Sequence, residues 1–175
     1  TRPLRGVRGV PHAKLAELVA ERALSSPTSA SRDGRALTAL FGAAWEDGLA
    51  AIGLLATSVA DEPDAALALA LDWADRIDYV TAADALGWLV LGPAAAGGGA
   101  IGEVLDALGA HPRAETRRAA ASMGLAFTPA EVEGPAAAGL RARHGSRALR
   151  MVDAPVEAVL STIVRRFVRD KAPQV

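Results

Sequence analysis

The chain has 175 residues, 19 of them basic and 20 acidic, which is the length of one compact domain with a core large enough to fold alone. It contains no cysteine, which excludes disulfides and thiolate metal sites, and no uninterrupted apolar run reaches the roughly 18 residues that span a bilayer. Alanine dominates the apolar residues and aromatic residues make up only 4%, which favours helix over sheet. We therefore expect an all-α cytoplasmic protein with no membrane partner.

Apolar residues recur at helical spacing along the chain. Asp33 is placed to cap the second helix, and the helix that starts at Asp78 or Thr81 is expected to end at Gly92-Pro93. We expect about eight or nine short helices with no strand between them. Their predicted ranges are 11–25, 33–41, 46–60, 63–77, 78–92, 100–109, 112–126, 129–143 and 154–170.

These helices predict one helical-repeat domain over residues 1–175, interrupted by a flexible Gly/Ala segment at 94–100. Helix pairs recur at roughly 30 to 40 residues, within the range of HEAT and armadillo solenoids. The alternative is a globular bundle, but large bundles usually contain a central helix that is apolar all round. No helix of this chain has that pattern, so we expect a HEAT-like solenoid, an α–α superhelix.

Charge is unevenly distributed. Residues 1–112 hold 8 basic and 14 acidic side chains, whereas residues 113–175 hold 11 basic and 6 acidic ones. A basic C-terminal part attracts polyanions, and an acidic front part repels them. The alternative interpretation is that charged residues on solvent-exposed helix faces are unevenly distributed by chance and that this asymmetry attracts no binding partner.

One carboxylate, Asp84, lies inside an otherwise apolar helix. An unpaired charge is costly in an apolar environment, so Asp84 either faces solvent or is placed there for a task. Arg117 and Arg118 begin a second helical run 33 and 34 residues later. The carboxylate in one helix and the arginines at the start of a later helix are the pattern in this sequence that indicates a functional site.

The two helices resemble those of the AlkD-type DNA alkylation repair proteins, which are HEAT-like DNA glycosylases. In that family a Trp-containing turn leads into a helix with an aromatic residue one turn before an aspartate, and a later helix opens with arginine and alanines. Residues 77–86 and Arg117-Arg-Ala-Ala-Ala match this pattern, and the resemblance covers roughly residues 30–170. The chain departs from it at Val80, where the family has its aromatic, and has no tryptophan after Trp88.

The resemblance implies a protein that binds duplex DNA and excises or senses alkylated bases, without a cofactor or a metal. Asp84 would stabilise the oxocarbenium-like sugar as the glycosidic bond breaks, and Arg118, with Arg117, would grip a phosphate. Tyr79 and Trp88 would supply aromatic walls. Further arginines would line the DNA backbone, namely Arg147, Arg150, Arg165, Arg166 and Arg169.

Each of these residues also has a structural interpretation. Asp84 can form a structural pair with an arginine, and Arg117-Arg118 can cap the turn after Pro112. Cations are favoured in the last turns of the terminal helix without any DNA. Trp45, Trp73 and Trp88 are typical packing residues. The alternative function is therefore a non-catalytic HEAT-repeat scaffold that holds a protein or peptide partner in its concave groove.

Overall fold

The computed structural model describes residues 8–127 and, near the C-terminus, the helical residues 161, 163, 165 and 167. All regular structure in these ranges is helical, which confirms the all-α prediction. The elements are α1 (His12–Ser25), α2 (Ala30–Phe41), α3 (Trp45–Ser58), α4 (Pro63–Ala74), α5 (Val80–Leu86), the π-helical segment η1 (Gly87–Leu91), α6 (Gly92–Gly97), α7 (Ile101–Gly109), α8 (Ala114–Ser122) and the 3₁₀ segment η2 (Met123–Phe127).

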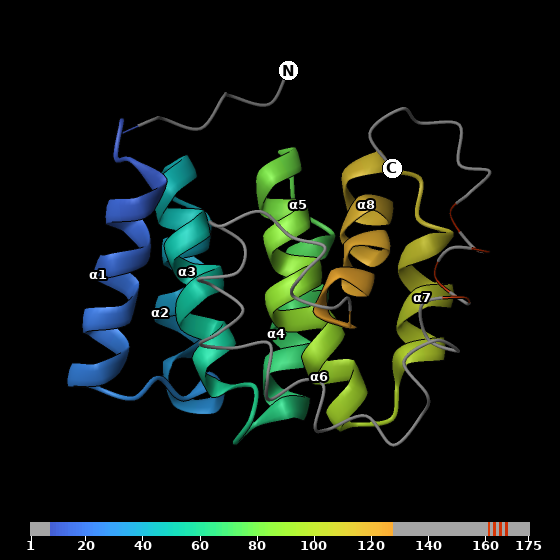
Figure 1. Ribbon diagram of the computed structural model, residues 1–175, viewed down its shortest axis with the longest axis horizontal. Coiled ribbons are helices and arrows are strands. Elements are labelled where there is room, and N and C mark those ends of the chain that lie inside the picture. Colours follow the sequence, from blue (N-terminus) through green and yellow to red (C-terminus); the bar gives the residue numbers. More distant parts are fainter. Residues whose placement is uncertain (1–7, 128–160, 162, 164, 166, 168–175) are drawn as a thin grey trace.

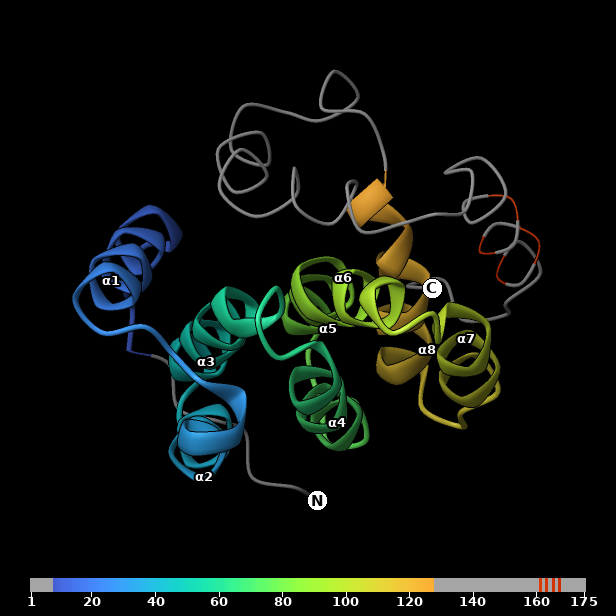
Figure 2. The same cartoon turned by 90° about the horizontal axis from the view of Figure 1, so that it is seen from below.

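The helices stand side by side, with short loops joining consecutive ones (Figure 1). Seen along the helix axes, α1, α3, α5 and α8 follow one another in a row, and α2 and α4 lie beneath it (Figure 2). Contacts connect α1 with α3, α3 with α5 and α5 with α8 along the row, and α2 with α4 in the second layer. Helix α7 packs against α8 at the far end.

The second helix starts earlier than the sequence suggested. Ser29, rather than Asp33, is its N-cap: the Ser29 hydroxyl oxygen accepts from the Arg32 N–H at 3.1 Å. Asp33 lies one turn inside, where its carboxylate reaches back to accept the Ser29 N–H at 3.0 Å. Serine and carboxylate thus each satisfy a backbone donor at the start of the helix, as in a capping box, but the carboxylate is at the fourth helical residue instead of the third.

The predicted helix end at Gly92-Pro93 is wrong. The Gly92 N–H donates to the Gly87 carbonyl, five residues back, and this wider turn carries the chain from α5 through η1 into α6. Pro93 then occupies the first turn of α6, where a missing N–H costs no helical hydrogen bond. The π segment therefore lets a helix continue past a proline that would otherwise end it.

The segment predicted as a flexible linker, 94–100, is helical over its first four residues. Ala94, Ala95 and Ala96 belong to α6 and are buried, since their small side chains fit between packed helices. The turn comes only after them, at Gly99, whose φ of 70° is in the left-handed region that favours glycine.

Two glycines bring the central helix into backbone contact with its neighbour. A Cβ atom on Gly87 would overlap the Ala119 carbonyl oxygen, and one on Gly92 would lie 2.8 Å from the Met123 carbonyl oxygen. Gly87 and Gly92 are five residues apart, and the π turn places both against α8 and η2. This close approach sets how α5 and α8 face each other.

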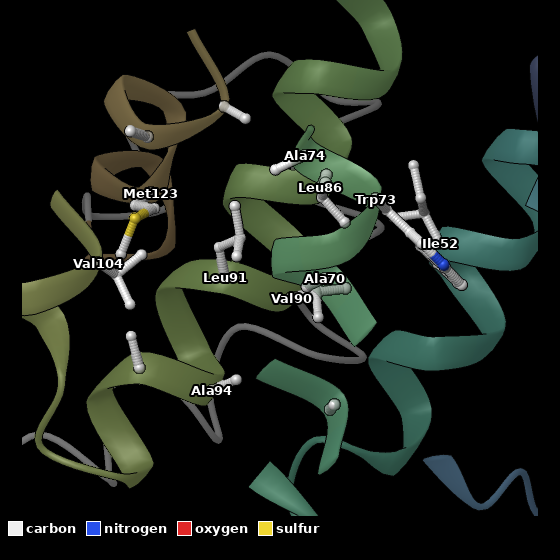
Figure 3. Close-up of a cluster of buried hydrophobic side chains, with 14 of the residues drawn as sticks. Ile52, Ala70, Trp73, Ala74, Leu86, Val90, Leu91, Ala94, Val104 and Met123 are labelled. Atoms are coloured by element: carbon white, nitrogen blue, oxygen red, sulfur yellow. The ribbon is translucent and has the colours of Figure 1, made fainter. Parts of the chain in front are cut away.

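The core runs continuously from α3 across α4 and the α5–η1–α6 helix to α7 and η2 (Figure 3). Its largest side chain is Trp73, which is fully buried, stacks on Phe41 with ring centroids 4.6 Å apart, and donates to the Thr38 hydroxyl at 3.1 Å. Small residues fill much of the remainder, so helices approach closely and a few bulky groups supply the volume.

The central stretch Val80–Gly97 is the one helix in the described part of the chain that is long and apolar enough to cross a membrane. More than half of it, 56%, is buried inside the protein. Packing against α4, α8 and η2 accounts for its apolar character, because a core helix meets the same criteria.

The predicted helix at 129–143 lies outside the described residues. Of the helix predicted at 154–170, Ser161, Ile163, Arg165 and Phe167 are helical, and Ile163 and Phe167 are buried.

Gly87→Ala is expected to destabilise the protein by about 3 kcal/mol or more, because the added methyl group overlaps a backbone oxygen that cannot move without shifting α8. Gly102→Ala is the matched control: it also lies in a helix, nothing is within 4 Å of its added Cβ, and stability should be unchanged or rise by up to about 1 kcal/mol. Urea unfolding measures both. Equal stability of the two variants would contradict the close approach.

Candidate functional site

Asp84 and Arg118 meet across the α5–α8 interface. The Arg118 Nε and Nη2 groups donate to the two oxygens of the Asp84 carboxylate, each at 2.7 Å. Their side chains are 32% and 28% exposed, so the pair lies at the surface rather than in the core. Two parallel hydrogen bonds fix the plane of the carboxylate as well as its position.

Ser122 completes the grip on Asp84. Its hydroxyl donates to Asp84 Oδ1 at 2.6 Å. Arg118 and Ser122 are four residues apart on α8 and so share one face of that helix. The sequence interpretation missed Ser122, although the Arg-x-x-x-Ser spacing was a usable signal once Arg118 was assigned to a helix.

The pair borders an open depression of about 240 Å³, lined by Asp84, Arg118, Ala121, Ser122 and Leu125. The lining combines the polar side chains of Asp84, Arg118 and Ser122 with the apolar ones of Ala121 and Leu125, and Leu125 is 40% exposed. The Arg118 guanidinium offsets the charge of this carboxylate, so the depression presents a fixed ion pair beside an exposed apolar side chain.

The aromatic residues do not join this depression. Tyr79 is the N-cap of α5, where its hydroxyl donates to the Trp45 carbonyl at 2.9 Å and its ring lies 5.6 Å from that of Trp45. Tyr79 therefore points toward α3, whereas Asp84 faces α8. Trp88 is half-buried against the core and is not among the lining residues.

The other predicted arginines have structural partners or lie outside the described residues. Arg117 donates from Nη1 to the carbonyls of His111 and Pro112, both at 2.9 Å, so it caps the turn after Pro112. Arg165 donates to the Ser161 hydroxyl at 2.8 Å. The remaining members of the predicted DNA track are not described, namely Arg147, Arg150, Arg166 and Arg169.

Residues 8–127 carry a net negative charge. Residues 8–127 hold 9 basic and 15 acidic side chains. No group of three or more His, Asp or Glu residues with the geometry of a metal site occurs in the described part of the chain.

Comparison with protein-family models, with curated proteins and with solved structures gives no match for this chain. The resemblance to AlkD-type repair proteins, which depends on the motifs around Asp84 and Arg118, stays a prediction.

A double-mutant cycle measures the energy that couples Asp84 to Arg118. Combining Asp84→Asn with Arg118→Ala should give a coupling of about 1 kcal/mol, because the contact is bidentate and partly shielded from water. The matched control is the i,i+4 pair of Asp72 and Arg76, which is more exposed and should couple by less than about 0.5 kcal/mol. Equal coupling in the two cycles would show that the bidentate geometry adds nothing.

Proposed function

We propose that this chain is a HEAT-like helical-repeat protein that binds duplex DNA, is related to the alkylpurine DNA glycosylases, and excises or senses alkylated bases. The observation that carries the proposal is the Asp84–Arg118 contact at an open depression. These two residues come from the motifs that carry the resemblance, and they meet at the surface.

The arrangement of the helices supports a repeat architecture. Helices α2 and α3 pack as one pair, α4 packs against the continuous α5–η1–α6 helix, and α7 packs against α8. Helices α3, α5 and α8 contact one another in order along the row (Figure 2). In a helical solenoid each helix pair packs on the pair before it, and the order α3, α5 and α8 along the row is consistent with that principle.

The contribution of Asp84 to folding stability is too small to explain why an aspartate occurs inside this helix. Aspartate is a poor helix former, and a partly exposed ion pair contributes about 0 to 1 kcal/mol. A carboxylate whose position is fixed by Arg118 and Ser122 can instead stabilise positive charge that develops on a deoxyribose ring, since it needs no reorganisation during the reaction. In this proposal Arg118 positions Asp84 and does not grip a phosphate.

A second candidate function is favoured by a different observation. Residues 8–127 have more acidic than basic side chains, and a net negative charge repels DNA. Arg117 and Arg118 are also engaged within the protein. The alternative is therefore a non-catalytic helical-repeat scaffold that holds a protein or peptide partner in its concave groove.

Release of 7-methylguanine from methylated duplex DNA tests the catalytic part. Asp84→Asn should lower the excision rate on the order of 10²-fold or more, because it keeps the shape and removes the charge. Asp72→Asn, an exposed carboxylate in another helix, is the control and should leave the rate unchanged. No release by the unsubstituted protein would favour the scaffold, and unchanged release by Asp84→Asn would contradict the role of that residue.

Salt-dependent binding tests the role of Arg118. DNA affinity should fall steeply with salt, and Arg118→Ala should lower excision while leaving the slope of log affinity against log salt unchanged. A slope smaller by about one unit would assign Arg118 to a phosphate contact instead. Absence of DNA binding at low salt would favour the scaffold.

A further inference from the structure

Helix α1 is held differently from the other helices. None of its residues is buried, and Leu18 and Leu24 are 46% and 87% exposed. Val19 lies against Gly53 of α3, where an added Cβ would be 3.0 Å from the Val19 side chain. Burial of apolar area therefore contributes less to docking α1 than to the helices with fully buried residues, and an isolated helix of its length is marginal in water.

A buried carboxylate compensates for this weak packing. Glu46, in the first turn of α3, is only 2% exposed. Its Oε2 accepts the Arg8 N–H at 2.9 Å, and its Oε1 accepts the N–H groups of Gly9 and Val10 at 2.6 and 3.2 Å. Three successive N–H groups thus surround one carboxylate, as in the backbone nests that bind anions. The φ of 74° at Gly9 lets the chain wrap around it.

Contacts on either side of Glu46 strengthen the attachment. The Arg8 guanidinium donates to Asp47 Oδ2 from Nε at 3.0 Å and from Nη2 at 2.6 Å. The His12 ring, at the start of α1, stacks on Trp45 with centroids 5.1 Å apart. The segment that leads into α1 is therefore fastened to the first three residues of α3.

We propose that Glu46 is a latch that holds α1 on α3, so that α1 detaches as a unit when this carboxylate loses its charge. The groups around the latch are Arg8 on the leading segment, His12 on α1, Asp47 on α3 and Tyr79, which reaches Trp45 from the start of α5. Detachment would open the face of α3 that Val19 covers and leave the rest of the row in place.

The protonation state of Glu46 is consistent with this latch. Hydrogen bonding from the Arg8 N–H, followed by that from Gly9 and Val10, lowers the pKa of Glu46 below its usual value of 4.5, against the opposing effect of burial. A lowered pKa in the folded state means that the latch stabilises docking above the usual pKa and loses this effect as the pH falls through the lowered one.

Hydrogen exchange of Glu46→Gln tests the proposal. Amides of α1, residues 12–25, should exchange on the order of tenfold to hundredfold faster than in the unsubstituted protein, because charge-assisted hydrogen bonds are lost. Amides of α4 to α8 should not change. Glu103→Gln, an exposed carboxylate on α7, is the control and should alter neither region. Unchanged exchange in α1, or equal acceleration in every helix, would overturn the latch.

Acid titration of the unsubstituted protein, compared with Glu46→Gln, gives a second test. In the unsubstituted protein, α1 should lose its protection, corrected for intrinsic exchange, in a one-proton transition below pH 4.5 while α4 to α8 stay protected. That transition should be absent in Glu46→Gln. A transition that persists in this variant, or none in the unsubstituted protein, would assign the docking of α1 to other contacts.

Discussion

The contact of Gly87 and Gly92 with the backbone of α8 and η2 is the constraint on which the centre of the molecule depends. Because glycine has no side chain, the two helical segments approach so closely that a Cβ atom on either glycine would contact a backbone carbonyl oxygen of the neighbouring segment. Asp84 lies one turn before Gly87. The short separation of the helices brings its carboxylate within hydrogen-bond distance of Arg118 and Ser122. A larger residue at Gly87 would push α8 away, so the packing of the core and the geometry of the ion pair have the same origin.

Sequence periodicity was enough to predict the helical class and most helix positions, because each helix has an apolar stripe at 3.6-residue spacing. The prediction of helix boundaries was wrong where the conformational preference of the local residues differs from the conformation that tertiary packing favours. Gly92-Pro93 and the alanines after it are typical of a helix end and a linker, yet burial of Ala94 and Ala95 favours helix there. A π turn has no residue signature that distinguishes it from an α turn.

The candidate site was predictable in part. The sequence placed Asp84 and Arg118 in one candidate site, with Arg118 expected on a phosphate and a structural pair with an arginine as the alternative for Asp84. The structure shows that pair. Ser122 and the separation of Tyr79 from Asp84 were not predictable, because they depend on which face of α5 lies against α8. The nest around Glu46 was equally invisible, since backbone N–H groups leave no pattern in the residue types.

The π-helical segment η1 also bears on how this chain could change length over evolution. A π turn inserts one residue into an α-helix, so α5 and α6 are out of register by that residue. Deleting any residue of 87–91 would remove the wider turn that accommodates Pro93 and rotate α6 by roughly 100° relative to α5. The buried alanines of α6 would then leave the core. Insertions and deletions that surface loops accept are therefore excluded from this segment.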